Sequence, residues 1–237
     1  MIPGTNIRQA LTGPFRLLSI LMMVLCCMIP AAASTQQRFQ AALENLDKQE
    51  YEKAERELGA ALKQARSERN PSAEGKAWFY LGLTRQKQVE EQGDRYPSKV
   101  TGWLRSARES YERATRYIPD SGGLWNNLAQ IYDKLGDRER AAGAFQRAIG
   151  LTDAQQMLYT VNYADFLSRS RRGENAVRLY EFVLQRQPGN EHAQQALINY
   201  NLKRDPERVC ELLRMQLNRG QVMRAFDASV SLLERSA

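Results

Sequence analysis

Few residues of this chain have the types and spacing that catalysis or metal binding requires. His192 is the only histidine among 237 residues, so there is no histidine pair for a metal and no obvious base for a serine or cysteine nucleophile. Cys210 falls at a helix-packing position, where we expect a buried and inert thiol. The carboxylates fall on polar helix faces, where solvation accounts for them. We therefore expect a protein that is not an enzyme and that uses no metal or cofactor.

The elements that must position any binding residues are predicted to be helices. Ala, Leu, Gln, Glu, Arg and Lys dominate the composition, and β-branched runs are nearly absent, which predicts an all-α fold. The segment 124–149 shows two helix faces separated by a turn at Gly136. The first face comprises Trp125, Leu128, Ala129 and Tyr132, and the second comprises Ala141, Phe145 and Ala148.

This spacing resembles the tetratricopeptide repeat, a pair of antiparallel helices with small and aromatic residues at fixed positions. The pattern recurs in units at about 35–68, 75–121, 122–155 and 157–190. A degenerate fifth unit covers 191–218, with Cys210 at its small position and Arg214 at its aromatic position. The segment 221–235, with Val222, Phe226, Val230 and Leu233 on one face, is predicted to be a capping helix. The resemblance implies a right-handed α-solenoid over residues 35–237.

The second unit carries about thirteen extra residues, with an insertion near 88–100. We expect both of its helices to be longer, which makes a protruding hairpin, with Ser98 capping the second helix. The alternative is a longer loop with Tyr96 and Trp103 folded back.

The N-terminus has the features of a secretory signal peptide over residues 1–33. Arg8 and Arg16 precede an apolar run from Leu17 to Ile29, and Pro30 and three alanines follow, which predicts cleavage after Ala33. A retained membrane anchor over residues 17–33 is the alternative. A lipoprotein signal at Cys26 or Cys27 fits poorly, because no small residue precedes either cysteine.

A signal peptide implies that the chain is exported, and two further features of the sequence favour the bacterial cell envelope as its destination. The mature chain would carry one cysteine and no N-x-[ST] sequon. We therefore expect a periplasmic protein of the bacterial cell envelope.

The resemblance implies that the first helix of each pair lines a concave groove that holds a protein or peptide partner. The expected lining forms two rows: Phe39, Phe79, Asn126, Val161 and Gln195, and Leu43, Leu83, Gln130, Asp165 and Asn199. The rows are apolar in the N-terminal half and polar in the C-terminal half. This gradient suggests that a partner anchors apolar side chains in the N-terminal half, at Phe39, Leu43, Phe79 and Leu83. The alternative for Phe39 and Leu43 is that they pack within the terminal unit. The rows lack the lysines that some family members use to bind a C-terminal carboxylate.

The leading functional hypothesis is an exported adaptor that assembles envelope proteins. A structural component that self-associates into a homo-oligomer is the second hypothesis, and a polysaccharide-binding solenoid with Trp103, Tyr159 and Tyr163 as platforms is the third. The interspersed charges argue against a nucleic-acid footprint, which needs a concentrated basic face.

Overall fold

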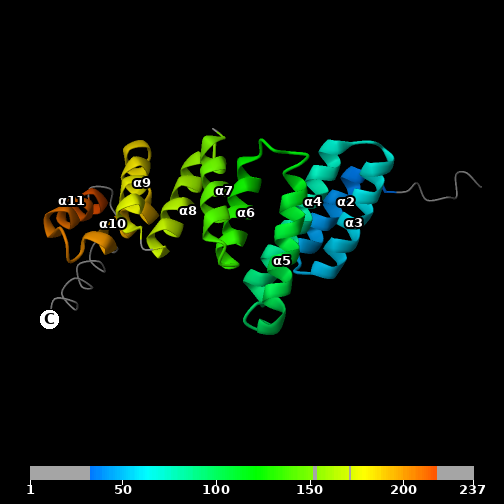
Figure 1. The fold of residues 1–237 in the computed structure, drawn as a ribbon, viewed down its shortest axis with the longest axis horizontal. Helices are drawn as coiled ribbons and strands as arrows, with labels where there is room; N and C mark the ends of the chain where they lie inside the picture. Colours follow the sequence, from blue (N-terminus) through cyan, green and yellow to red (C-terminus); the bar gives the residue numbers. More distant parts are fainter. Residues whose placement is uncertain (1–32, 152–153, 171, 218–237) are drawn as a thin grey trace, which may run out of the picture.

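The computed structural model describes residues 33–151, 154–170 and 172–217, and within these ranges it contains ten α-helices and no strand. The helices form consecutive antiparallel pairs in an elongated row that runs from α2 at one end to α11 at the other (Figure 1). The predicted all-α solenoid is therefore confirmed. The predicted capping helix at 221–235 and the signal segment up to residue 32 lie outside the described residues. None of the described helices is long and apolar enough to cross a membrane.

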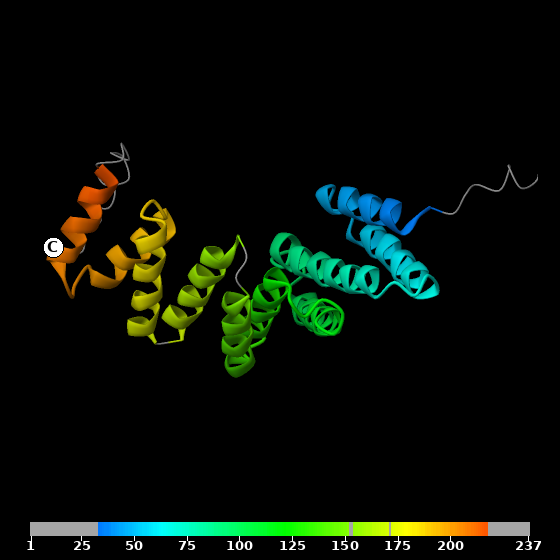
Figure 2. The same cartoon turned by 90° about the horizontal axis from the view of Figure 1, so that it is seen from above.

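Each repeat contributes one helix that we call A and a second that we call B. The A helices are α2 (Thr35–Asp47), α4 (Pro71–Gln92), α6 (Gly122–Lys134), α8 (Gln156–Arg169) and α10 (Glu191–Asn201). The B helices are α3 (Tyr51–Ser67), α5 (Pro97–Ala114), α7 (Arg138–Gly150), α9 (Gly173–Arg186) and α11 (Pro206–Leu217). Each helix packs against the next along the chain, and successive A helices from α2 to α8 also contact one another. Figure 2 shows the same row from above.

Local capping explains where these helices begin and end. The side chains of Asn70, Ser121, Asp137 and Asn190 each accept a hydrogen bond from a backbone N–H in the first turn of the helix that follows. Gly136 lies in the turn after α6 and has a φ of 81°, in the left-handed region that favours glycine. The sequence had predicted that this glycine ends the helix. The N–H groups of Gly136 and Asp137 bond back to the carbonyls of Asp133 and Tyr132. Three residues therefore suffice to reverse the chain between α6 and α7.

The inserted residues of the second unit form a long helical hairpin. Helix α4 has 22 residues and α5 has 18, with the chain reversing at residues 93–96. The end of this hairpin projects beyond the neighbouring pairs in Figure 1. The rings of Tyr96 and Trp103 meet at its tip, with centroids 6.3 Å apart. Ser98 does not cap α5, because the helix begins at Pro97, whose missing N–H suits the first helical position.

Small residues let the two helices of each pair approach closely. Ala42, Gly82, Ala129 and Ala164 are buried at matching positions of four A helices, and Ala54, Ala107, Ala141 and Ala176 are buried in the B helices. The tightest approach is at Gly82, where an added methyl group would lie 2.6 Å from Cδ1 of Tyr111. Tyr111 is fully buried, and its hydroxyl donates to Oε1 of Gln86 at 2.9 Å. The ring is therefore fixed against α4 by contacts one helical turn apart.

The fifth unit differs from the sequence prediction in its register. Val209 is the fourth residue of α11, the position that Ala141 and Ala176 hold in α7 and α9, and it is 1% exposed. Leu213, one turn later, is also buried. Cys210 is exposed, so the expectation of a buried thiol was wrong, because the turn before α11 shifts the helix by one residue. Leu213 rather than Arg214 stands at the aromatic position.

Replacing Gly82 by alanine tests this packing. The clash with the ring of Tyr111 costs about 1–3 kcal/mol as overpacking, which outweighs the gain in helix propensity of roughly 1 kcal/mol. We expect the Gly82→Ala chain to melt at a lower temperature in circular dichroism. Gly143→Ala is the matched control, because nothing lies within 4 Å of the added methyl group in α7, and it should melt at the same or a higher temperature. A Gly82→Ala chain as stable as the control would contradict the account.

Candidate functional site

The structure places the ten predicted groove residues in three different environments. Gln195 and Asn199 are exposed on α10. Five more are half-buried: Leu43, Phe79, Leu83, Gln130 and Asp165. The remaining three, Phe39, Asn126 and Val161, are 5–7% exposed and do not line an open surface.

Close packing of neighbouring helices explains why these predicted groove residues are buried. Phe39 belongs to the core of α2, α3 and α4, with its ring 6.0 Å from that of Tyr80. Val161 is part of the main core. Phe79 is half-buried, and its ring lies 5.4 Å from Tyr80 and 5.9 Å from Tyr111. Phe39 and Leu43 thus pack within the N-terminal unit, which is the alternative given for them above, and Phe79 packs against the main core. Among the four apolar residues predicted to line the N-terminal half of the groove, Leu83 is the one that belongs to no described core cluster. Its side chain is half-buried.

Charged side chains link successive A helices across the concave face. Glu90 of α4 pairs with Lys134 of α6 at 3.5 Å, and Asp133 of α6 pairs with Arg169 of α8 at 2.9 Å. Asp165 of α8 then contacts Nε2 of His192 on α10 at 2.8 Å. In every case the acid lies on the earlier helix. We call this series the ion-pair ladder.

Neutral amides reinforce the ladder between the same helices. Gln86 donates to Gln130 at 3.4 Å, and Asn162 donates to Oδ1 of Asn126 at 2.9 Å. Asn126, predicted to bind a partner, instead joins two repeats. Between α4 and α8 the polar groups of the concave face are thus largely occupied by one another.

Asp165 connects three helices of the fourth and fifth units. Its Oδ1 accepts hydrogen bonds from the hydroxyl of Tyr180 on α9, at 2.5 Å, and contacts the ring of His192 on α10. Burial, together with the hydrogen bond to Asp165, raises the pKa of Tyr180 well above its ordinary value. The contact with His192 spans a junction at which the two A helices do not pack directly.

An open cleft occurs at this junction. Helices α2 to α8 contact one another in succession, but α8 and α10 share no such packing among the described elements. The cleft between them has a volume of about 490 Å³ and is lined by Ser168, His192, Gln195, Ala196, Asn199, Tyr200 and Arg204. We call it the α8–α10 cleft. A smaller cleft of about 220 Å³ between α6 and α8 is lined by Gln130 and Asp165, among others.

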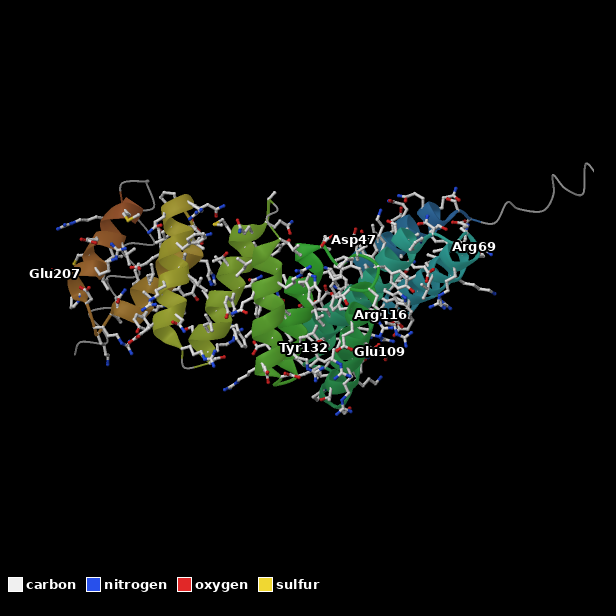
Figure 3. The ribbon with its side chains drawn as sticks, turned by 45° about the horizontal axis from the view of Figure 1, so that its top comes forward. Asp47, Arg69, Glu109, Arg116, Tyr132 and Glu207 are labelled. Carbon is white, nitrogen blue, oxygen red and sulfur yellow. The ribbon has the colours of Figure 1, made fainter. Side chains whose placement is uncertain are left out.

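The α8–α10 cleft offers hydrogen-bonding groups. Gln195 donates from Nε2 to Oδ1 of Asn199 at 3.2 Å, and both amides keep further donors and acceptor capacity that match the N–H and C=O groups of an extended peptide. No group of three or more His, Cys, Asp or Glu residues in the described ranges is placed to hold a metal. Figure 3 shows side chains along the whole row, with Arg69 labelled near one end and Glu207 near the other. A partner in the cleft would thus lie far from the N-terminal unit.

Comparison with protein families identifies the repeat. The family model described as tetratricopeptide repeat matches residues 102–155, which include α6 and α7 and the segment Leu124–Ile149. Residues 102–155 therefore form a segment of the tetratricopeptide-repeat type. Arrays of this kind are typically non-enzymatic and present an extended surface to protein or peptide partners.

A curated relative shares part of the array. The chain is 26% identical over 108 residues to the pre-mRNA-splicing factor CLF1 of Kluyveromyces lactis. The match covers 43% of this chain and spans only 16% of the length of that splicing factor.

Solved structures share the fold at low sequence identity. MamA superposes with a TM-score of 0.54 at 16% identity, covering 85% of this chain and 92% of MamA. YrrB, a tetratricopeptide protein with an unusual peptide-binding site, gives 0.55 at 20% identity, covering 81% and 90%. The human IFIT1 dimer with PPP-AAAA gives 0.67 at 20% identity, covering 87% of this chain and 49% of IFIT1.

The raised pKa of Tyr180 predicts a pH dependence of stability. Below about pH 10 the phenol is protonated in both states, so its stabilising contribution is complete. Above that pH the unfolded chain loses the proton while the folded chain keeps it, so stability falls by up to about 1.4 kcal/mol per pH unit for this group. We expect the free energy of unfolding of Tyr180→Phe to fall less steeply between about pH 10 and 11 than that of the wild type. Identical slopes in urea titrations would contradict this.

Proposed function

We propose that this protein is a non-enzymatic scaffold that binds an extended segment of a partner protein in the α8–α10 cleft. One observation carries the proposal. Gln195 and Asn199 are the two residues of the predicted groove that are exposed, and both line this cleft. The other eight are wholly or partly covered by neighbouring repeats.

The chemistry of the cleft favours a peptide over a nucleic acid. Lys134 and Arg169 of the ion-pair ladder are matched with carboxylates, so the concave face lacks the concentrated positive charge that phosphate backbones require. A likeness to IFIT1 with PPP-AAAA concerns the fold alone and does not outweigh this. The peptide-binding site named for YrrB shows that an array of this fold can hold a peptide.

Photo-crosslinking from inside the cleft tests the proposal. We expect a photoreactive residue at Gln195 or Asn199 to capture the same partner chain in native cells. Gln185 on α9 is the matched control, because it is exposed and lines none of the described clefts, and it should not capture that chain. The purified partner should bind Asn199→Trp, which fills the cleft without changing its charge, at least about tenfold more weakly than the wild type, which corresponds to about 1.4 kcal/mol.

Two outcomes would overturn the proposal. Equal capture from Gln185 would place the partner elsewhere, and capture of a second copy of this chain would favour the self-associating structural role.

We further propose export to the bacterial cell envelope, on the basis of the sequence of residues 1–33. The start of α2 supports cleavage after Ala33. The hydroxyl of Ser34 accepts from the N–H of Gln37 at 3.2 Å, and the N–H of Ser34 donates to Oε1 of Gln37 at 2.7 Å. Cleavage there would leave this capping box complete within the mature chain.

N-terminal sequencing of the chain from fractionated cells tests the export proposal. We expect the soluble envelope fraction to hold a chain that begins at Ser34. A chain that keeps residues 17–33 and remains in the membrane fraction would instead establish the anchor.

A further inference from the structure

The α8–α10 cleft is the last of three clefts that adjoin one another around the end of the array. The first, of about 380 Å³, lies between α7 and the end of α8 and is bounded by Arg138 and Arg172. The second, of about 510 Å³, shares Arg172 with the first. It also shares Ser168, Tyr200 and Arg204 with the α8–α10 cleft. The shared residues make one continuous path, which we call the arginine track after Arg138, Arg172 and Arg204.

The three arginines of the track differ from the cations of the ion-pair ladder. Lys134, Arg169 and His192 each have a carboxylate partner on a neighbouring helix. None of the ion pairs among the described residues involves Arg138, Arg172 or Arg204. All three side chains are exposed, so their guanidinium groups are available to a ligand.

Tyr200 holds the side chain of Arg204 in place, and the guanidinium group can still bind a carboxylate. Its guanidinium lies 4.4 Å from the centroid of the Tyr200 ring, and Nη1 donates to the carbonyl oxygen of Tyr200 at 2.8 Å. An arginine has five N–H donors, so most remain for a carboxylate. A guanidinium that is already oriented loses less conformational entropy when it binds such a group in a bidentate manner.

The first cleft adds an apolar element to the track. Ala142 and Phe166 line it between the two arginines, so it can receive an apolar side chain flanked by carboxylates. Glu139 and Glu174 also line the track, which limits its net positive charge. A nucleic acid would meet these carboxylates with its phosphates and would have no use for the apolar surface. An acidic peptide with an apolar residue satisfies both features.

We propose that the arginine track binds an acidic segment of the partner, with one apolar side chain seated between Arg138 and Arg172 and carboxylates on Arg172 and Arg204. This rests on the proposed function and names the chemical class of the partner segment. The segment would run past Ser168 and Tyr200, which two of the clefts share, and enter the concave face beside Asn199.

Fluorescence anisotropy on the whole mature chain tests the assignment. The probe is a fluorescein-labelled peptide of about ten residues, roughly 33 Å when extended, with a central leucine flanked by glutamates and aspartates. We expect saturable binding at low salt. Replacing the leucine of the probe by glycine should weaken binding at least about threefold, and a lysine version should not bind.

Charge-matched variants locate the site. Arg172→Gln and Arg204→Gln should each weaken binding at least about fivefold. Arg178→Gln removes the same charge from an exposed position of α9 that lines none of the three clefts, and it should change the affinity by less than about twofold. Circular dichroism of each variant confirms that it is folded.

Three results would overturn the inference. The first is that the acidic probe does not bind. The second is that all three substitutions weaken its binding equally. The third is that a single-stranded oligonucleotide of the same length binds more tightly than the acidic probe. If crosslinking from Asn199 still captures one partner chain, the proposed function stands and the class of partner segment is wrong. If crosslinking also fails, both proposals fall.

Discussion

The close approach of two helices at small buried residues is the constraint on which this molecule depends. At Gly82 the ring of Tyr111 fills the space that a side chain would occupy, and Ala129 and Ala164 are fully buried at the equivalent positions. Because the two helices of each pair are packed this closely, the pairs can stack on one another, and successive A helices come into contact from α2 to α8. Contact between A helices in turn covers the positions of Phe39, Asn126 and Val161.

Sequence reasoning succeeded where the signal was local. Within one pair, the distances from Trp125 to Tyr132 and from Ala141 to Ala148 follow from helix periodicity, so the pairing and the turn at Gly136 were predictable. The long hairpin followed from the extra residues between Arg85 and Ala107 and from their helical composition. These features need no information about other repeats.

The candidate site depended on distances between repeats, which periodicity does not contain. Asn126 and Asn162 are 36 residues apart, as are Asp133 and Arg169, and their contacts arise only once the repeats are stacked. Sequence reasoning therefore assigned Asn126 to a partner when it binds another repeat. The register of α11 was missed for a different reason. A turn that differs by one residue moves Val209 into the core and Cys210 out of it, and degenerate side chains gave no signal for the shift.

These observations fit a division of roles along the array. Between α4 and α8, polar side chains hold the repeats at a fixed spacing. Beyond α8 the A helices of the described residues pack less closely, and the contact between Asp165 and His192 links α8 to α10. The exposed amides and the arginine track lie on this side of the array. Under the proposed function, the regular part serves as a rigid support and the partner binds where this regularity is interrupted.

Amide hydrogen exchange of the mature chain, with and without its purified partner, tests the central claim most directly. The claim is that partners bind where A-helix packing stops. We expect the partner to slow exchange in α10 and in the C-terminal half of α8, and to leave α2 and α4 unchanged. Slowed exchange confined to α2 and α4, with α10 unaffected, would contradict the account.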